Sequence, residues 1–303
     1  MRVFLISLAA TIAAIVLVFG LVAGLAIRKM EAKTEIEDHT WLHLDLYGSL
    51  PEYDPPSGLA GVLSGGDQQT LQSILTNLAM AEYDERIDGV VLQLSASQDA
   101  GQGKLEEIRR GVARLRQAGK PVLAYADNID LDVLHVAAAC DSFFCPPPAY
   151  IVITGLDTSH PHIKRGLAKL GVEPHLSAIK DYKSAAQIIN REDLTPEARA
   201  NKEWILEEFM ELYVEGLEQG RGLNQDQLVA AMEKVEILSD EALAMGLVDG
   251  VIYWDELAAR FVEDEEDGPR LVSGSRYAQE NPVDLGLNGD KKIAVIHAQG
   301  NIG

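Results

Sequence analysis

Two hydrophobic periods alternate along residues 41–125, one typical of strands and one typical of helices. Short apolar or alternating runs predict strands, and apolar residues that recur every three or four positions predict helices between them. Strands that alternate with helices indicate βαβ units and a parallel sheet, so the expected fold class is α/β. The expected elements here are strands at 41–47, 89–94 and 121–125 and helices around 71–78 and 105–115.

The rest of the chain continues this pattern with less regular spacing. Thr-Pro-Glu at 195–197 has the features of a helix start: a capping hydroxyl, proline at the first helical position and an acid in the first turn. We expect that helix to run to about Gly220, and Asn224 and Ser239 to begin two shorter ones. The remaining expected elements are helices near 133–139 and 163–170 and strands at 143–145, 151–153, 175–179 and 247–254.

The first 27 residues carry a different pattern. Residues 3–27 form 25 consecutive positions without a charge. At about 1.5 Å per residue, a helix of this length exceeds the roughly 30 Å hydrocarbon core of a bilayer, so we expect a transmembrane anchor. A cleavable signal peptide is the alternative, because Gly24 and Ala26 are small residues of the kind found at cleavage sites. Basic residues lie on both sides of the stretch, so charge leaves the membrane orientation open.

The expected domain layout follows from these patterns. Its parts are an anchor at 1–27, a charged tether at 28–40, one complete α/β domain at 41–285 and a last segment at 286–303. In the last segment an apolar stretch followed by Gly300 repeats the strand and Gly48 of residues 41–50. If the match is a true repeat and not a chance similarity, a second copy of the domain begins there and is cut off after its first strand.

Composition narrows the class of protein. The 303 residues include 26 Lys and Arg against 47 Asp and Glu, which gives a net charge of −21. Phosphates need a basic surface, so this balance argues against a nucleic-acid partner. Two cysteines are too few for a disulfide scaffold. We expect Cys140 and Cys145 to be buried thiols, with a disulfide between them as the alternative.

Most of the chemical motifs in the chain are weak. No nucleophile elbow, Walker loop, dinucleotide fingerprint or His-Glu-x-x-His motif occurs, and we predict no metal or cofactor. Residues 64–66, Ser-Gly-Gly, follow a Pro/Gly-rich loop instead of a strand and are expected to be loop. Residues 101–103 precede a helix whose first N–H groups could bind an anion, or form a plain turn. His160 and His162 are expected in a surface turn.

Lys183 is the residue that we single out for catalysis. It lies between a predicted strand and a predicted helix, beside the small residues Ser184, Ala185 and Ala186. The positive end of the helix dipole and close packing of another surface would both lower the pKa of the lysine, as a general base requires. A solvated surface lysine is the alternative from the residues alone.

Several segments resemble the N-terminal half of the long (67K) type of signal peptide peptidase A, in peptidase family S49. The similar segments include the N-terminal apolar stretch, the opening strand with Gly48, and residues 89–94, 119–124 and 137–141. The most specific are Asp-Tyr-Lys-Ser-Ala at 181–185 and Arg-Glu-Asp-Leu-Thr-Pro-Glu-Ala-Arg at 191–199. In this resemblance Lys183 corresponds to the general-base lysine of the family.

The resemblance implies a crotonase/ClpP-like α/β fold in tandem copies and a serine endopeptidase that degrades cleaved signal peptides with a Ser–Lys dyad. The nucleophilic serine of the family comes from the second copy, so Ser184 is not the nucleophile and the 303-residue chain is expected to be inactive alone. The resemblance also implies a homo-oligomer in the bacterial inner (plasma) membrane, anchored in the bilayer through residues 3–27, with its body in the periplasm. The scarcity of basic residues before the anchor departs from that topology.

Two other classes of function stay open. A non-catalytic, membrane-anchored scaffold or pseudo-protease could bind peptides without cleaving them. A crotonase-like acyl-CoA enzyme would share only the fold, and both the anchor and the acidic body argue against it.

Overall fold

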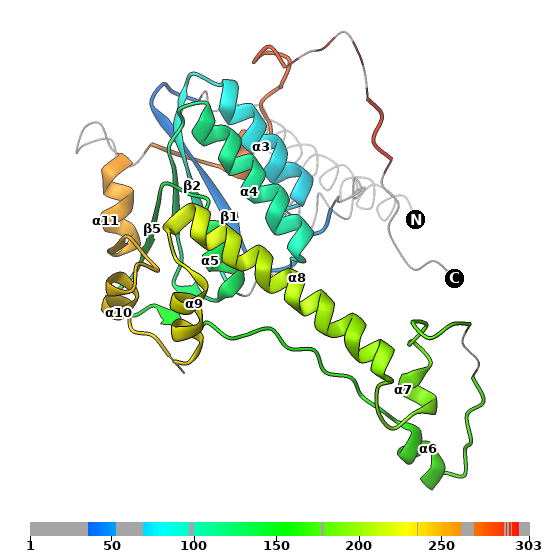
Figure 1. The fold of residues 1–303 in the computed structure, drawn as a ribbon. Coiled ribbons are helices and arrows are strands. Elements are labelled where there is room, and N and C mark those ends of the chain that lie inside the picture. Colours follow the sequence, from blue (N-terminus) through cyan, green and yellow to red (C-terminus); the bar gives the residue numbers. More distant parts are fainter. Residues whose placement is uncertain are drawn as a thin grey trace, which may run out of the picture. The chain divides into compact units, whose positions relative to one another are not determined.

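The computed structural model describes residues 36–52, 69–96, 100–176, 179–234, 236–261, 270–287, 289, 291 and 293–296. The chain divides into two units, Met1–Glu37 and Asp38–Gly303. The second unit contains every helix and strand reported below (Figure 1). Residues 3–27 and 64–66, for which we predict an anchor and a loop, lie outside the described residues. Within the described part of the chain, no helix is both long and apolar enough to cross a membrane.

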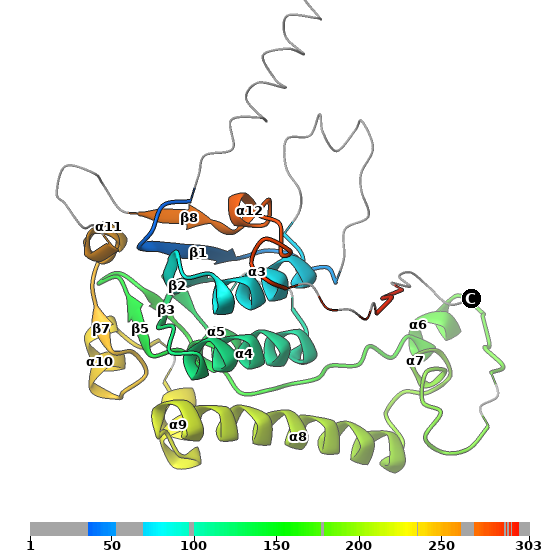
Figure 2. The same ribbon diagram turned by 90° about the horizontal axis from the view of Figure 1, so that it is seen from above.

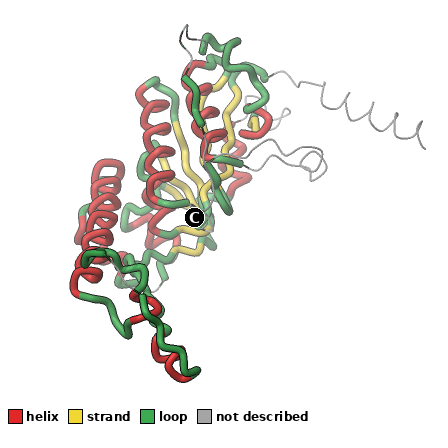
Figure 3. Tube along the Cα trace, turned by 90° about the vertical axis from the view of Figure 1, so that its right-hand side faces the viewer, coloured by secondary structure: helices red, strands yellow, loops and turns green. Residues whose placement is uncertain are grey.

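A six-stranded parallel sheet is the centre of the second unit (Figure 3). Every neighbouring pair of strands runs parallel, as the alternation of strands and helices predicts. Leu42, Leu44 and Leu46 of the strand β1 are fully buried, because alternate side chains of that strand point to one face of the sheet. The strands, in their order across the sheet, are β7 (Gly250–Val251), β5 (Ser142–Cys145), β3 (Val122–Tyr125), β2 (Ile87–Leu94), β1 (Thr40–Leu46) and β8 (Leu271–Ser273).

Helices α3 (Leu71–Tyr83) and α4 (Gln102–Gln117) lie side by side over one face of this sheet (Figures 1 and 2). A Cβ atom on Gly111 of α4 would lie 2.7 Å from the Leu78 Cδ1 atom of α3, so glycine permits this close packing. Gly119 follows α4 with φ +83°, which agrees with the predicted end of that helix.

The other face of the sheet is covered by α11 (Trp254–Ala258) and the 3₁₀ helix η1 (Ala259–Phe261). Leu257 and Phe261 pack there against Val91 and Tyr125. The additional elements are a two-stranded parallel sheet of β4 (Asn128–Ile129) and β6 (Tyr150–Ile151), with α5 (Leu131–Ala137), α9 (Gln225–Met232), α10 (Ser239–Ala244) and α12 (Gly274–Tyr277).

The longest described helix, α8 (Pro196–Arg221), has the start that the sequence predicts. The Thr195 side chain accepts a hydrogen bond from the N–H of Ala198, and Pro196 occupies the first turn. Gly222 ends the helix in the left-handed conformation with φ +67°. At the N-terminal end of α8 lie the short helices α6 (Lys164–Lys169) and α7 (Gln187–Asn190), far from the parallel sheet (Figures 1 and 2). We call residues 154–197, without residues 177 and 178, the arm.

Some predicted strands are wrong in whole or in part. The strand predicted at 151–153 keeps only Ile151, in β6. His175, Leu176 and Ile179 lie in no strand, because the arm offers no neighbouring strand to pair with them. The strand predicted at 247–254 is reduced to Gly250–Val251, since Tyr253 already caps α11.

The predicted strand near the C-terminus is not present among residues 293–296, which are the part of it that the structure describes. Ile293 and Ile296 are each 90% exposed there, and no strand among the described residues pairs with them. The interpretation of this segment as the start of a second copy stays a prediction.

Candidate active site

Lys183 lies in a turn of the arm, between Lys180 and α7. Its backbone N–H donates to the Lys180 carbonyl oxygen at 3.3 Å, and Lys180 has the left-handed φ of +72°. The Lys183 side chain is exposed, and no hydrogen bond or ion pair joins it to another described residue. The helix start expected next to it comes later, because α7 begins at Gln187 and has only four residues. Among the described residues nothing encloses the amine.

The turn is fastened to the start of α8 by one side chain. Gln187 donates from Nε2 to Thr195 Oγ1 at 3.0 Å and accepts at Oε1 from the Thr195 N–H at 3.2 Å. Its own N–H donates to the Ser184 carbonyl oxygen at 2.9 Å. The segment before α6 is attached as well, because His162 Nδ1 lies 3.1 Å from the Gln187 carbonyl oxygen.

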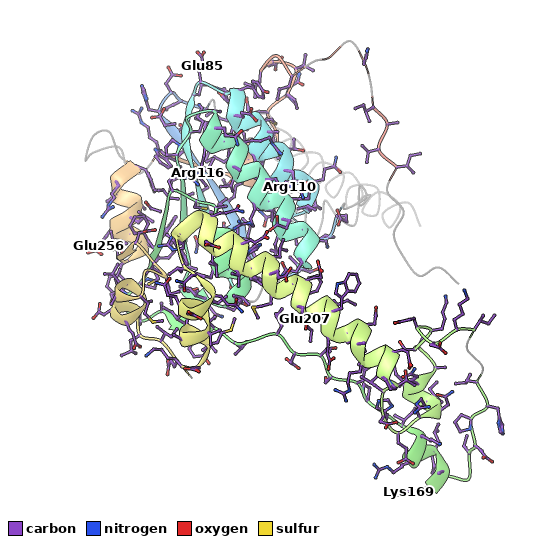
Figure 4. All side chains as sticks on the ribbon, in the orientation of Figure 1. Glu85, Arg110, Arg116, Lys169, Glu207 and Glu256 are labelled. Atoms are coloured by element: carbon purple, nitrogen blue, oxygen red, sulfur yellow. The ribbon has the colours of Figure 1, made fainter. Side chains whose placement is uncertain are left out.

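Several large apolar side chains are exposed on the arm and on the neighbouring part of α8. Ile179 is 84% exposed, Leu170 78% and Tyr182 68%. Trp204 and Phe209 are exposed on α8, the helix that carries the labelled Glu207 in Figure 4. Exposed apolar side chains that form a contiguous patch mark an interaction site.

The C-terminal third of α8 is held on the body of the unit by a buried polar cluster. The Tyr213 hydroxyl donates to Asp132 of α5, and His135 Nε2 lies 2.6 Å from Glu106 Oε1 of α4. Arg109 of α4 bonds both Glu106 and the His135 carbonyl oxygen. Burial, with the charge of Arg109, lowers the pKa of His135 to about 4. This histidine is therefore neutral at pH 7 and donates to the carboxylate.

Two glycines let α8 approach this cluster. A Cβ atom on Gly216 would lie 2.7 Å from His135 Nδ1, and one on Gly220 would lie 1.8 Å from the Ala138 carbonyl oxygen. This contact was not predicted from the sequence. The available signal was the pair of glycines four positions apart, which places both on one face of a helix.

The weaker candidates have structural roles. Gly101 is the N-cap of α4, and Gln102 donates to Asp132 at 3.0 Å. His160 and His162 belong to the arm, and no group of three or more possible metal ligands occurs among the described residues. Cys140 and Cys145 are buried free thiols, as predicted. Burial raises the pKa of the Cys140 thiol to about 12, so it is not an activated nucleophile.

Residues 114–266 match the model of peptidase family S49, which is half of the chain and includes the whole arm. The chain belongs to peptidase family S49. Serine protease SPPA of the Arabidopsis thaliana chloroplast is 27% identical over 239 residues, which cover 77% of this chain and 35% of that protein. Protease 4 of Haemophilus influenzae is 29% identical over 238 residues, which cover 74% of this chain and 39% of that protein. This S49 chain thus spans little more than a third of the length of these curated relatives.

Solved structures resemble the S49 chain more distantly. A membrane-bound stomatin-specific protease is 14% identical with a TM-score of 0.41, over 74% of this chain and 85% of that one. An enoyl-CoA isomerase from M. smegmatis is 17% identical with a TM-score of 0.38, over 73% of this chain and 77% of that one.

Proposed function

We propose that Lys183 is the general base of an SppA-type serine endopeptidase, and that this chain supplies the lysine half of its Ser–Lys dyad. One observation carries the proposal: the matched S49 region contains the segment Asp-Tyr-Lys-Ser-Ala at 181–185, whose lysine is exposed on the arm and has no partner among the described residues. A lysine base that meets a serine from elsewhere needs to be presented in this way.

The chemistry requires a change in the surroundings of Lys183. A lysine acts as a base only when its amine is neutral, and desolvation by a second surface lowers its pKa towards that state. The neutral amine then takes the proton of the serine hydroxyl as its oxygen attacks the peptide carbonyl. The same proton goes to the leaving amine, and a later water molecule releases the acyl group.

We assign the serine to the part of the relatives' length that this chain does not span. The relatives match this chain over only 35% and 39% of their own length, which leaves room for a second S49 copy. Ser184 is next to Lys183 in sequence and does not fill this role in the family pattern. The chain alone is therefore expected to cleave no peptide. A crotonase/ClpP-like fold for both copies belongs to the same proposal, and the parallel α/β sheet agrees with it.

The substrates and the setting are part of this proposal. Cleaved signal peptides and other membrane-associated peptides suit an enzyme anchored through residues 3–27. The bacterial relatives named Protease 4 support a bacterial, membrane-associated protein. The plasma membrane and a body in the periplasm are part of the proposal. The exposed apolar surface of the arm supports assembly into a homo-oligomer.

The test compares this chain with the full-length protein that includes the downstream region. We expect the full-length protein to hydrolyse a synthetic signal peptide in detergent, and Lys183→Ala to lower kcat by about 10²–10⁴-fold, the usual contribution of a general base. Lys169→Ala is the matched control, because it removes another exposed lysine of the same arm (Figure 4). Activity at the wild-type level in Lys183→Ala would overturn the assignment. A full-length protein that binds the peptide without cleaving it would favour the non-catalytic scaffold.

A further inference from the structure

Gln187 is the one buried residue among the described residues of the arm. Its exposed fraction is 7%, whereas Lys183 and Tyr182, a turn away, are exposed. An arm stabilised only by apolar contact would bury an apolar side chain at this point. A buried amide is costly unless its hydrogen bonds are made, so its presence indicates that its bonds are needed.

Both ends of the Gln187 amide are bonded to a single residue. Nε2 donates to Thr195 Oγ1 at 3.0 Å, and Oε1 accepts from the Thr195 N–H at 3.2 Å. Two hydrogen bonds between the same two residues fix the orientation of the Gln187 amide plane as well as its distance from Thr195. Thr195 Oγ1 also accepts from the Ala198 N–H at 3.3 Å, so the amide is attached to the cap of α8.

The backbone connects this attachment to Lys183. From Gln187 one backbone hydrogen bond of 2.9 Å leads to the carbonyl of Ser184, the residue after Lys183. On its other side, Thr195 begins α8, a continuous helix of 26 residues. The C-terminal end of α8 is held against the body of the unit by Tyr213 and by the close contact of Gly220. The position of the Lys183 backbone relative to the parallel sheet therefore depends on the pairing of Gln187 with Thr195.

We propose that Gln187 is a positioning residue for the lysine base, acting through Thr195. The inference rests on the proposed function of Lys183. A displacement of about 1 Å of a catalytic group can cost up to about 100-fold in rate, so loss of this pairing lowers kcat and leaves substrate binding unchanged.

The experiment uses the full-length protein and a synthetic signal peptide. Gln187→Leu keeps the buried volume and removes both bonds; we expect kcat to fall about 10- to 100-fold with KM unchanged. Thr195→Val removes the partner hydroxyl, and the double variant is expected to be no slower than the slower single variant, because both act through one contact. Thr195→Ser keeps the hydroxyl, so its kcat is expected to stay close to the wild-type value and above that of Thr195→Val.

Arg165→Gln is the matched control. It removes an exposed ion pair of the same arm, between Arg165 and Glu192 at 3.2 Å, that does not touch Gln187. We expect its kcat and KM to stay at the wild-type level. The thermal unfolding midpoint of Gln187→Leu is also expected to stay unchanged, because the arm lies outside the core.

The outcomes separate this inference from the proposed function. If Lys183→Ala abolishes hydrolysis and Gln187→Leu keeps the wild-type kcat, the positioning role is wrong and the role of Lys183 stands. A rise in KM without a fall in kcat, or additive effects in the double variant, also overturns the positioning role. If Lys183→Ala is fully active, the proposed function fails whatever the Gln187 variants do.

Discussion

Gly220 of α8 packs against Ala138, the residue that caps the C-terminal end of α5. A Cβ atom there would lie 1.8 Å from the Ala138 carbonyl oxygen and 2.6 Å from the carbonyl carbon, which are backbone atoms that cannot rotate away. We expect Gly220→Ala to lower the free energy of unfolding by about 1–3 kcal/mol, the usual cost of overpacking, even though alanine favours helices. Urea unfolding followed by circular dichroism measures the change.

Gly103 supplies the matched control for this substitution. It lies in the first turn of α4, where an added Cβ atom would meet nothing within 4 Å. Gly103→Ala is therefore expected to be neutral or to stabilise the protein by up to about 1 kcal/mol through helix propensity. Equal losses in the two variants would mean that the contact between α8 and α5 is looser than the structure shows.

At the scale of elements, the attachment of α8 is expected to depend on pH through His135. Burial and the charge of Arg109 lower its pKa from 6.5 to about 4, against the opposing effect of Glu106. The folded protein thus binds this proton more weakly than the unfolded chain, so stability is fully present above pH 6.5 and falls as the pH drops towards 4. Between pH 7 and pH 5 the loss amounts to about 2 kcal/mol.

A neutral substitute isolates this contribution. His135→Gln can still donate to Glu106 but does not titrate. Between pH 7 and pH 5, the variant is therefore expected to lose about 2 kcal/mol less of its free energy of unfolding than the wild-type protein does. Both proteins are compared by urea unfolding at the two pH values. Identical pH profiles would show that His135 does not cause the acid sensitivity. Asp132 and Tyr213, which face the cluster from α5 and α8, are unchanged in both proteins.

The elements differ in how far the sequence predicts them. The start of α8 was predictable because its cap, its proline and its first acid are local signals within three residues. The strand expected at 175–179 is wrong because a strand exists only where another strand pairs with it, and that information is not local. Lys183 was singled out from its position and a family motif, and its role as the general base stays a prediction. The burial of Gln187 was not predicted, because no sequence pattern marks a glutamine that will be buried.

At the scale of the whole molecule, the net charge of −21 bears on how the protein meets a membrane. An acidic body is repelled by anionic lipids, so surface electrostatics cannot hold it there. The anchor prediction assigns stable association to the apolar residues 3–27. We therefore expect the chain to stay with bacterial membranes in high salt and in alkaline carbonate, and a version that begins at Asp38 to be released.

The N-terminus of the membrane-bound chain decides between anchor and signal peptide. An uncleaved anchor predicts that mass spectrometry finds residues 3–27 intact in the mature protein. Cleavage after the small residues near Ala26 would instead leave an acidic soluble body, and carbonate would then release the protein. The distinction matters for catalysis, because an enzyme that takes peptides from the bilayer gains from being tethered beside it at a high effective concentration.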